Sequence, residues 1–252
     1  MEIKKLLYAT NLREPTYDLF ESLLDIKKTG LERIILLSEK DPEELRRRLS
    51  NEGVNLRTVE GSTPLPPRIL ETADREHASL IVAQLNREKR RLFRGGMVRD
   101  LIRNTRYPLL LVQENDTGRG SPTRGLFDSV ILATNWSDSA NKAFLYIIGL
   151  KEIVGVLDIV YVMNEKPTVK DIRQLKERIE ELRRICLEEH MDAESHIYAG
   201  RTAAEIVLAS KDYDATLIVM GYNSKGPVQE ILSGSACFRV VEESSVPVLI
   251  IP

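Results

Sequence analysis

Short strand-like runs alternate along the chain with longer segments in which apolar positions recur every three or four residues. In the second half, this pattern predicts strands at residues 129–133, 156–162, 194–198, 216–220 and 248–251. Strands that alternate with helices are typical of a parallel sheet covered by helices on both faces. The pattern therefore predicts an α/β fold.

The clearest helical segment spans residues 169–189. Its apolar side chains, at three- and four-residue steps, are Ile172, Leu175, Ile179, Leu182 and Cys186, so one face is expected to pack and the other to be solvated. Thr168 and Asp171 have the spacing of a capping box at its start. The counterpart in the first half is shorter, at residues 42–49, which indicates that this half has lost roughly half of the helix.

The two halves of the chain repeat each other at three points in the same order. The matching segments are 7–11 and 131–135, 80–82 and 217–219, and 107–112 and 246–251. Residues 114–127 lie between the copies, and their Gly, Pro and polar content suits a flexible linker. We therefore predict two tandem domains, at residues 1–113 and 128–252, each with a five-stranded parallel sheet.

The composition is that of an ordinary globular chain. Of its 252 residues, 42% are apolar and 29% are charged, and the formal net charge is −2, which argues against disorder and against a general affinity for nucleic acid. The chain begins directly with strand-like sequence, and no apolar run is long enough to span a membrane. We therefore expect a cytoplasmic protein. Cys186 and Cys237 lack the spacing of a metal or redox pair, so buried reduced thiols are expected.

The most informative stretch follows the strand at residues 216–220. It reads Met220-Gly221-Tyr222-Asn223-Ser224, and Gly234-Ser235-Ala236 follows at the start of the next helical segment. A strand-end glycine lets a ligand approach the backbone closely, and the free N–H groups of a helix start bind phosphate. Taken alone, these glycines would favour tight turns.

Together with the repeat and the terminal strand, this stretch resembles the signature of the universal stress protein family. In that signature a strand ends in Gly-x-x-Gly, nine residues follow, and Gly-Ser or Gly-Thr opens the last helix. Gly221 and Gly234-Ser235 stand at this spacing, whereas Ser224 replaces the second glycine. The resemblance implies a Rossmann-like fold of the adenine nucleotide alpha hydrolase type. It also implies that the domains form a pseudo-dimer through strands 107–112 and 247–251, and that chains form homo-oligomers.

The resemblance further implies an adenine-nucleotide site in the second domain, for ATP, ADP or AMP, with or without Mg²⁺. The residues assigned to it are Ala133, Thr134, Asn135, Val162, Met220, Gly221, Tyr222, Ser224, Gly234, Ser235 and Ala236. Asn11 and Asn135 stand where nucleotide-binding members carry an aspartate, and an amide keeps the hydrogen bonds but loses the charge. Each asparagine could equally cap the following helix. Trp136 could flank a base, although packing is favoured.

The first domain retains little of this motif. Only Gly95 matches a family glycine, Gly96 stands in place of the hydroxyl residue, and Gln84 replaces the strand-end glycine, so we interpret this half as a structural partner. A solvated face, rather than a phosphate or RNA site, is expected for the basic cluster Arg87, Lys89, Arg90, Arg91 and Arg94. The histidines are scattered, with no spacing that indicates a metal centre or an acid–base pair: His77, His190 and His196.

Three classes of function remain. We predict a nucleotide-binding stress regulator without efficient catalysis; the alternatives are a ligand-free interaction scaffold and a slow ATPase. Neither domain has a Ser-Gly-Gly-x-Asp-Ser loop after its first strand, which excludes the related enzymes that cleave ATP to AMP and pyrophosphate. The paired acids of a phosphoacceptor receiver domain are missing as well. No catalytic residue or metal ligand is assigned, since turnover would need a Mg²⁺ ligand and a placed water that the sequence does not identify.

Overall fold

The computed structural model describes residues 2–10, 23–38, 42–60, 65–85, 96–113, 124–164, 168–223 and 235–252. The chain divides into two compact units, Met1–Gly125 and Leu126–Pro252. This division falls within the segment 114–127, which the sequence predicts to be a linker. None of the described helices is long and apolar enough to cross a membrane.

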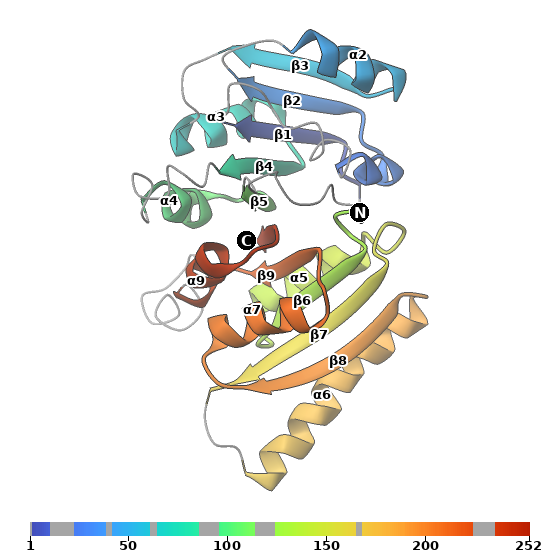
Figure 1. Ribbon diagram of the computed structural model, residues 1–252, viewed down its shortest axis with the longest axis vertical. Coiled ribbons are helices and arrows are strands. Elements are labelled where there is room, and N and C mark those ends of the chain that lie inside the picture. Colours follow the sequence, from blue (N-terminus) through green and yellow to red (C-terminus); the bar gives the residue numbers. More distant parts are fainter. Residues whose placement is uncertain are drawn as a thin grey trace. The chain divides into compact units, whose positions relative to one another are not determined.

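The first unit is a five-stranded parallel sheet with helices (Figure 1). Its strands are β1 (Lys5–Thr10), β2 (Arg33–Ser38), β3 (Asn55–Glu60), β4 (Leu80–Leu85) and β5 (Leu109–Gln113). They follow the spatial order β3-β2-β1-β4-β5, and each pair is parallel. The helices are η1 (Leu24–Thr29), α2 (Glu43–Asn51), α3 (Pro66–Glu76) and α4 (Gly96–Asn104).

The second unit repeats this arrangement. Its strands are β6 (Ser129–Thr134), β7 (Val156–Met163), β8 (Asp192–Ala199), β9 (Leu217–Gly221) and β10 (Val248–Ile251). Their order is β10-β9-β6-β7-β8, again with parallel pairs. The helices are α5 (Asp138–Ile148), α6 (Val169–Glu188), α7 (Thr202–Asp212) and α9 (Ser235–Glu243). The predicted tandem of parallel α/β sheets is confirmed.

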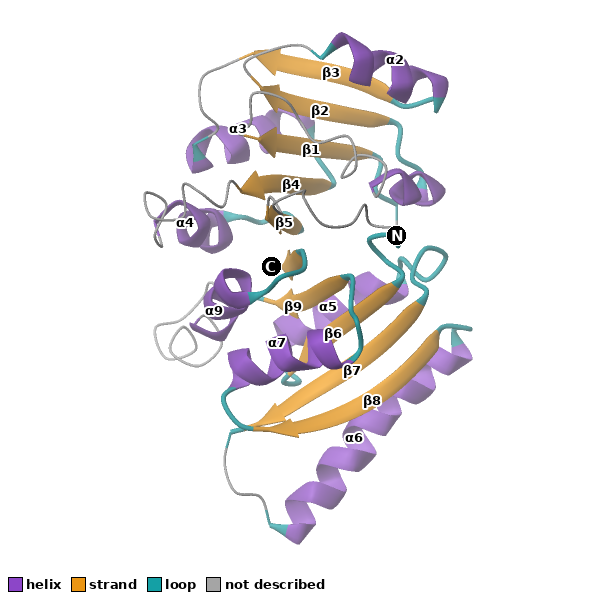
Figure 2. Ribbon diagram, viewed as in Figure 1, coloured by secondary structure: helices purple, strands orange, loops and turns teal. Residues whose placement is uncertain are grey.

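Helices cover both faces of the second sheet, with α6 on the far side and α7 on the near side in Figure 2. A strand buried on both faces needs a continuous apolar run, and every residue of the central strand β6 is accordingly buried. The edge strand β8 is more polar and only partly buried. Cys186 and Cys237 are buried and free, and burial raises the pKa of the Cys237 thiol to about 12, so this thiol stays protonated at neutral pH.

Helix α6 begins with the predicted capping box of Thr168 and Asp171. It has 20 residues, whereas α2 in the first unit has 9, so the predicted shortening is confirmed. Cys186 lies on the packed face at 0% exposure, but Ile172 is 37% exposed and the expectation that it packs is wrong. Asp171, Gln174 and Leu175 beside it border a cavity, and Ile172 lies outside this lining, on a part of α6 that is mostly exposed.

Candidate functional site

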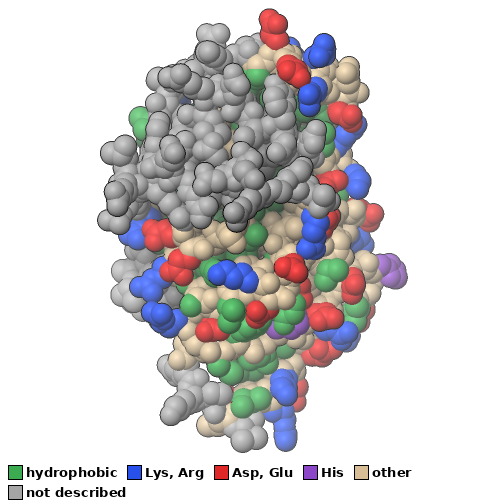
Figure 3. All heavy atoms as spheres, viewed as in Figure 1, with side chains coloured by type: hydrophobic (Ala, Val, Ile, Leu, Met, Phe, Trp, Pro, Cys, Tyr) green, Lys and Arg blue, Asp and Glu red, His purple; other side chains and the backbone are tan. Residues whose placement is uncertain are grey.

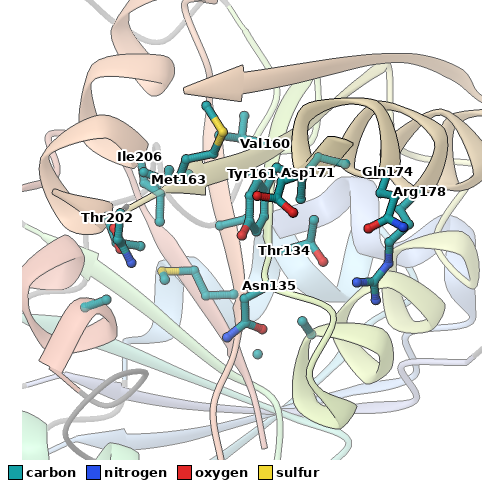
Figure 4. A pocket seen from close by; sticks show the side chains of 18 of the residues that line it. Thr134, Asn135, Val160, Tyr161, Met163, Asp171, Gln174, Arg178, Thr202 and Ile206 are labelled. Carbon is teal, nitrogen blue, oxygen red and sulfur yellow. The ribbon is translucent and has the colours of Figure 1, made fainter. Parts of the chain in front are cut away.

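A cavity of about 820 Å³ opens at the carboxyl ends of β6, β7 and β9 in the second unit (Figure 4). Strand β6 lies between β9 and β7. Because crossovers between parallel strands are right-handed, α5 after β6 and α9 after β9 lie on opposite faces of the sheet. In open parallel sheets, ligands bind in the crevice at such a switch point. The topology therefore favours this edge of the sheet as a binding site.

The cavity brings together most of the residues that the sequence assigns to a ligand site. Those that line it are Ala133, Thr134, Asn135, Val162, Met220, Gly221 and Ala236. Tyr222 is not among them, because its side chain is 1% exposed and packs on Phe238 with ring centroids 5.8 Å apart. Ser224 and Gly234 lie outside the described residues, and Ser235 is the first residue of α9.

Asn135 lies between Thr202 of α7 and Arg178 of α6 in the view of Figure 4. Its Oδ1 accepts hydrogen bonds from the backbone N–H of Ser137 at 3.1 Å and from the Ser137 hydroxyl at 2.7 Å. Ser137 is the N-cap of α5, and its hydroxyl oxygen accepts a hydrogen bond from the amide of Ala140 at 3.2 Å. Of the two roles left open for Asn135, helix capping is therefore wrong, because Ser137 is the N-cap and Asn135 orients it. Its Nδ2 has no partner among the described residues and is available to a ligand.

Gly221 has a packing role that the sequence did not indicate. A Cβ at this position would overlap the backbone carbonyl of Ser139 and lie 2.5 Å from the amide nitrogen of Ala140. Glycine is thus required because the first turn of α5 packs directly on the end of β9. The expectation that this glycine admits a ligand to the backbone remains a prediction, since Gly221 also lines the cavity.

Helices α6 and α7 supply lining residues that the sequence analysis missed. From α6 come Asp171, Gln174 and Arg178, and from α7 come Thr202 and Ile206. Residues three or four positions apart share one face of a helix. The spacing of Asp171, Gln174 and Arg178 in the sequence could therefore have indicated a polar helix face beside the site. The Thr168 hydroxyl and backbone N–H both donate to the Asp171 carboxylate, and these hydrogen bonds lower its pKa. Asp171 is therefore ionised at neutral pH.

Trp136 is held by packing at the edge of the site. Its ring lies on Tyr161 with centroids 4.3 Å apart, and the Arg178 guanidinium sits 4.3 Å from the Trp136 ring centroid. This is a cation–π arrangement. Trp136 is not among the lining residues of the cavity, so the structure favours packing over a contact with a base. The stack holds Arg178 at the cavity rim.

In the first unit, the buried side chain of Gln84 lies at the sheet edge that corresponds to the cavity. Sheet register places Gln84 beside Thr10 at the end of β1, and the hydroxyl of Tyr8 donates to Gln84 Oε1. Gln84 is 4% exposed, so its side chain occupies space next to the strand end. Asn11, Gly95 and the basic cluster of residues 87–94 lie outside the described residues.

A family profile and a related protein that match this chain in sequence point to the same family. The sequence profile of the Universal stress protein family matches residues 127–252. A universal stress protein from Methanocaldococcus jannaschii is 26% identical over 140 residues, which are 50% of this chain and 82% of that protein.

Solved structures with the same fold span the whole chain. A universal stress protein from Archaeoglobus fulgidus has 22% identity and a TM-score of 0.73, covering 99% of this chain and 96% of that one. A protein of unknown function from Pseudomonas aeruginosa has 18% identity and a TM-score of 0.69, and the match covers 99% of this chain and 92% of that one. The chain therefore belongs to the universal stress protein family, with the matched family domain in its second unit and the same fold repeated in its first.

Proposed function

We propose that the second unit binds an adenine nucleotide and that the chain is a stress-response regulator without efficient catalysis. The observation that carries this proposal is the cavity at the switch point, built from residues that the family signature assigns to a nucleotide. Its volume of about 820 Å³ lies within the range of roughly 300–1,000 Å³ that is usual for small-molecule sites. Cytoplasmic location and homo-oligomer formation stay predictions.

The cavity offers separate surfaces for a base and for phosphates. Ala133, Val160 and Met220 are neighbours in the sheet register, and together with Ile206 of α7 they make an apolar surface that suits an adenine ring. Ala236 brings the start of α9 to the same cavity. The first turn of α9 has no acidic residue, so its free N–H groups suit a phosphate.

The lining supports binding rather than turnover. The carboxylates among the described lining residues belong to Asp171 and Glu177 on α6. Asp171 is already occupied by two hydrogen bonds from Thr168, and the described lining contains no histidine or cysteine. We therefore assign no residue as a general base that would activate an attacking water.

The fluorescence of Trp136 tests this proposal, because it is the only tryptophan of the chain. Titration of the full chain with AMP or ATP is expected to change its emission in a saturable way, since a ligand beside Asn135 and Arg178 changes the surroundings of the indole ring. Isothermal titration calorimetry with the same nucleotides measures the heat of binding in parallel. Unchanged emission combined with no heat of binding would refute the proposal.

Asn135→Asp is expected to tighten AMP binding by about tenfold, because a charge-assisted hydrogen bond is stronger than a neutral one. The carboxylate can still accept from Ser137, and it replaces the Nδ2 donor with an acceptor for a ribose hydroxyl. Calorimetry of the full chain measures the change, with Asn11→Asp at the repeated position as the control that leaves affinity unaltered. Weaker binding by Asn135→Asp would mean that the ligand accepts from Nδ2, against the prediction.

A further inference from the structure

A second group of polar residues lies away from the cavity, on the face of the sheet that α7 covers. Register pairs Asp158 of β7 with Glu194 of β8, and His196 follows two positions later on β8. Side chains two positions apart on a strand point to the same face. His196 Nε2 lies 2.8 Å from Asp158 Oδ1 and 3.9 Å from Glu194 Oε2. One ligand atom from each residue thus falls within 4.8 Å of the others.

This cluster places two carboxylates, those of Asp158 and Glu194, beside a single imidazole. The Asp158 side chain is only 6% exposed, and carboxylates placed directly opposite each other on neighbouring strands repel. Among the described residues, the only basic side chain within 4.0 Å of Asp158 or Glu194 is His196. A bound cation would remove this repulsion.

His196 is oriented as metal-binding histidines usually are. Its Nδ1 lies 3.0 Å from the hydroxyl of Tyr213, and the two rings stack with centroids 4.2 Å apart. A hydrogen bond at one ring nitrogen fixes the tautomer and directs the other nitrogen to the metal. In the tautomer in which Nδ1–H donates to Tyr213, the Nε2 lone pair would be free to bind a metal ion beside the two carboxylates. Tyr213 thus supplies the outer contact that such a site needs.

The site is also accessible. The Glu194 side chain is 68% exposed and that of His196 is 15% exposed, so an ion can enter from the Glu194 side. Figure 3 shows that acidic and basic side chains are interspersed over the described part of the visible face. Ligand atoms about 2.0–2.1 Å from a tetrahedral zinc ion are separated by roughly 3.3 Å, a value between the two measured separations. Small side-chain rotations would therefore complete the geometry.

We propose that Asp158, Glu194 and His196 bind a divalent first-row transition metal of the Zn²⁺ class. An imidazole ligand favours this class over Mg²⁺ and Ca²⁺, which prefer all-oxygen sites. Three protein ligands leave a fourth position for water or for a group from another molecule. This site is independent of the nucleotide site, because none of its three residues lines the cavity.

The test uses the full chain without a histidine tag, after treatment with EDTA. Calorimetric titration with ZnCl₂ is expected to show one site per chain with micromolar or tighter affinity, and Co²⁺ should give the visible absorption of a tetrahedral ion. His196→Ala and Glu194→Gln are each expected to weaken Zn²⁺ binding at least tenfold. Glu194→Gln changes an exposed side chain, so a folding defect does not obscure its result.

His190→Ala is the matched control, since His190 is exposed and lies in the turn before β8. It is expected to bind Zn²⁺ as the wild type does. Absence of Zn²⁺ binding by the wild type would overturn the proposal and leave His196 and Asp158 as a simple hydrogen-bonded pair. Equal losses in His190→Ala and His196→Ala would overturn it as well.

Discussion

Gly221→Ala is expected to lower the free energy of unfolding of the second unit by about 3 kcal/mol. The added Cβ would overlap the carbonyl of Ser139 and approach the amide nitrogen of Ala140 to 2.5 Å. Both obstacles are backbone atoms, so the end of β9 or the start of α5 must move. Urea unfolding followed by Trp136 emission measures the effect, because Trp136 lies in this unit.

Gly96→Ala provides the matched control in the first unit. Gly96 is the first residue of α4, and a Cβ there would meet no atom within 4 Å. Replacing a glycine at a compatible helical position is neutral or stabilises by up to about 1 kcal/mol. If Gly221→Ala were as stable as the wild type, the close packing of β9 on α5 would be wrong.

Ala133→Phe is expected to weaken adenine-nucleotide binding about 100-fold, a loss of about 2.7 kcal/mol. Ala133 is paired in register with Val160 and Met220, on the apolar surface proposed for the adenine ring. A phenyl ring at this position would fill that space. Calorimetry with AMP and ATP measures the loss, and thermal unfolding checks that the variant still folds.

Ala9→Phe is the control for this substitution, because Ala9 occupies the repeated position in the first unit and is 2% exposed. It disturbs the packing of its own unit to a similar degree but should leave nucleotide affinity unchanged. Equal loss of binding in the two variants would show that the effect of Ala133→Phe arises from general destabilisation. Full binding by Ala133→Phe would place the nucleotide elsewhere.

The fold was predictable from the sequence because its signals are local. Continuous apolar runs reveal buried parallel strands, as in β6 and β9, and the capping box of Thr168 and Asp171 marks the start of α6. The strand-end residues of the cavity followed from the family signature. These signals depend on residues that are close together along the chain.

The missed features depend on contacts between distant residues. Asp158 and His196 are joined only by the register of β7 and β8, which periodicity does not provide, so the histidines seemed scattered. A strand-end glycine suits a turn, a ligand or a close helix equally, and only the position of α5 shows why Gly221 is a glycine. The polar stripe of α6 looked solvated because its position beyond the strand ends was unknown.

The number of nucleotides bound by the full chain tests the central proposal most directly. Calorimetric titration with ATP and with AMP is predicted to give one site per chain, because we propose that the cavity of the second unit binds the nucleotide, whereas Gln84 occupies the corresponding edge of the first unit. Two sites per chain would contradict the assignment to the second unit alone. No binding of either nucleotide would contradict the proposed function and favour the ligand-free scaffold.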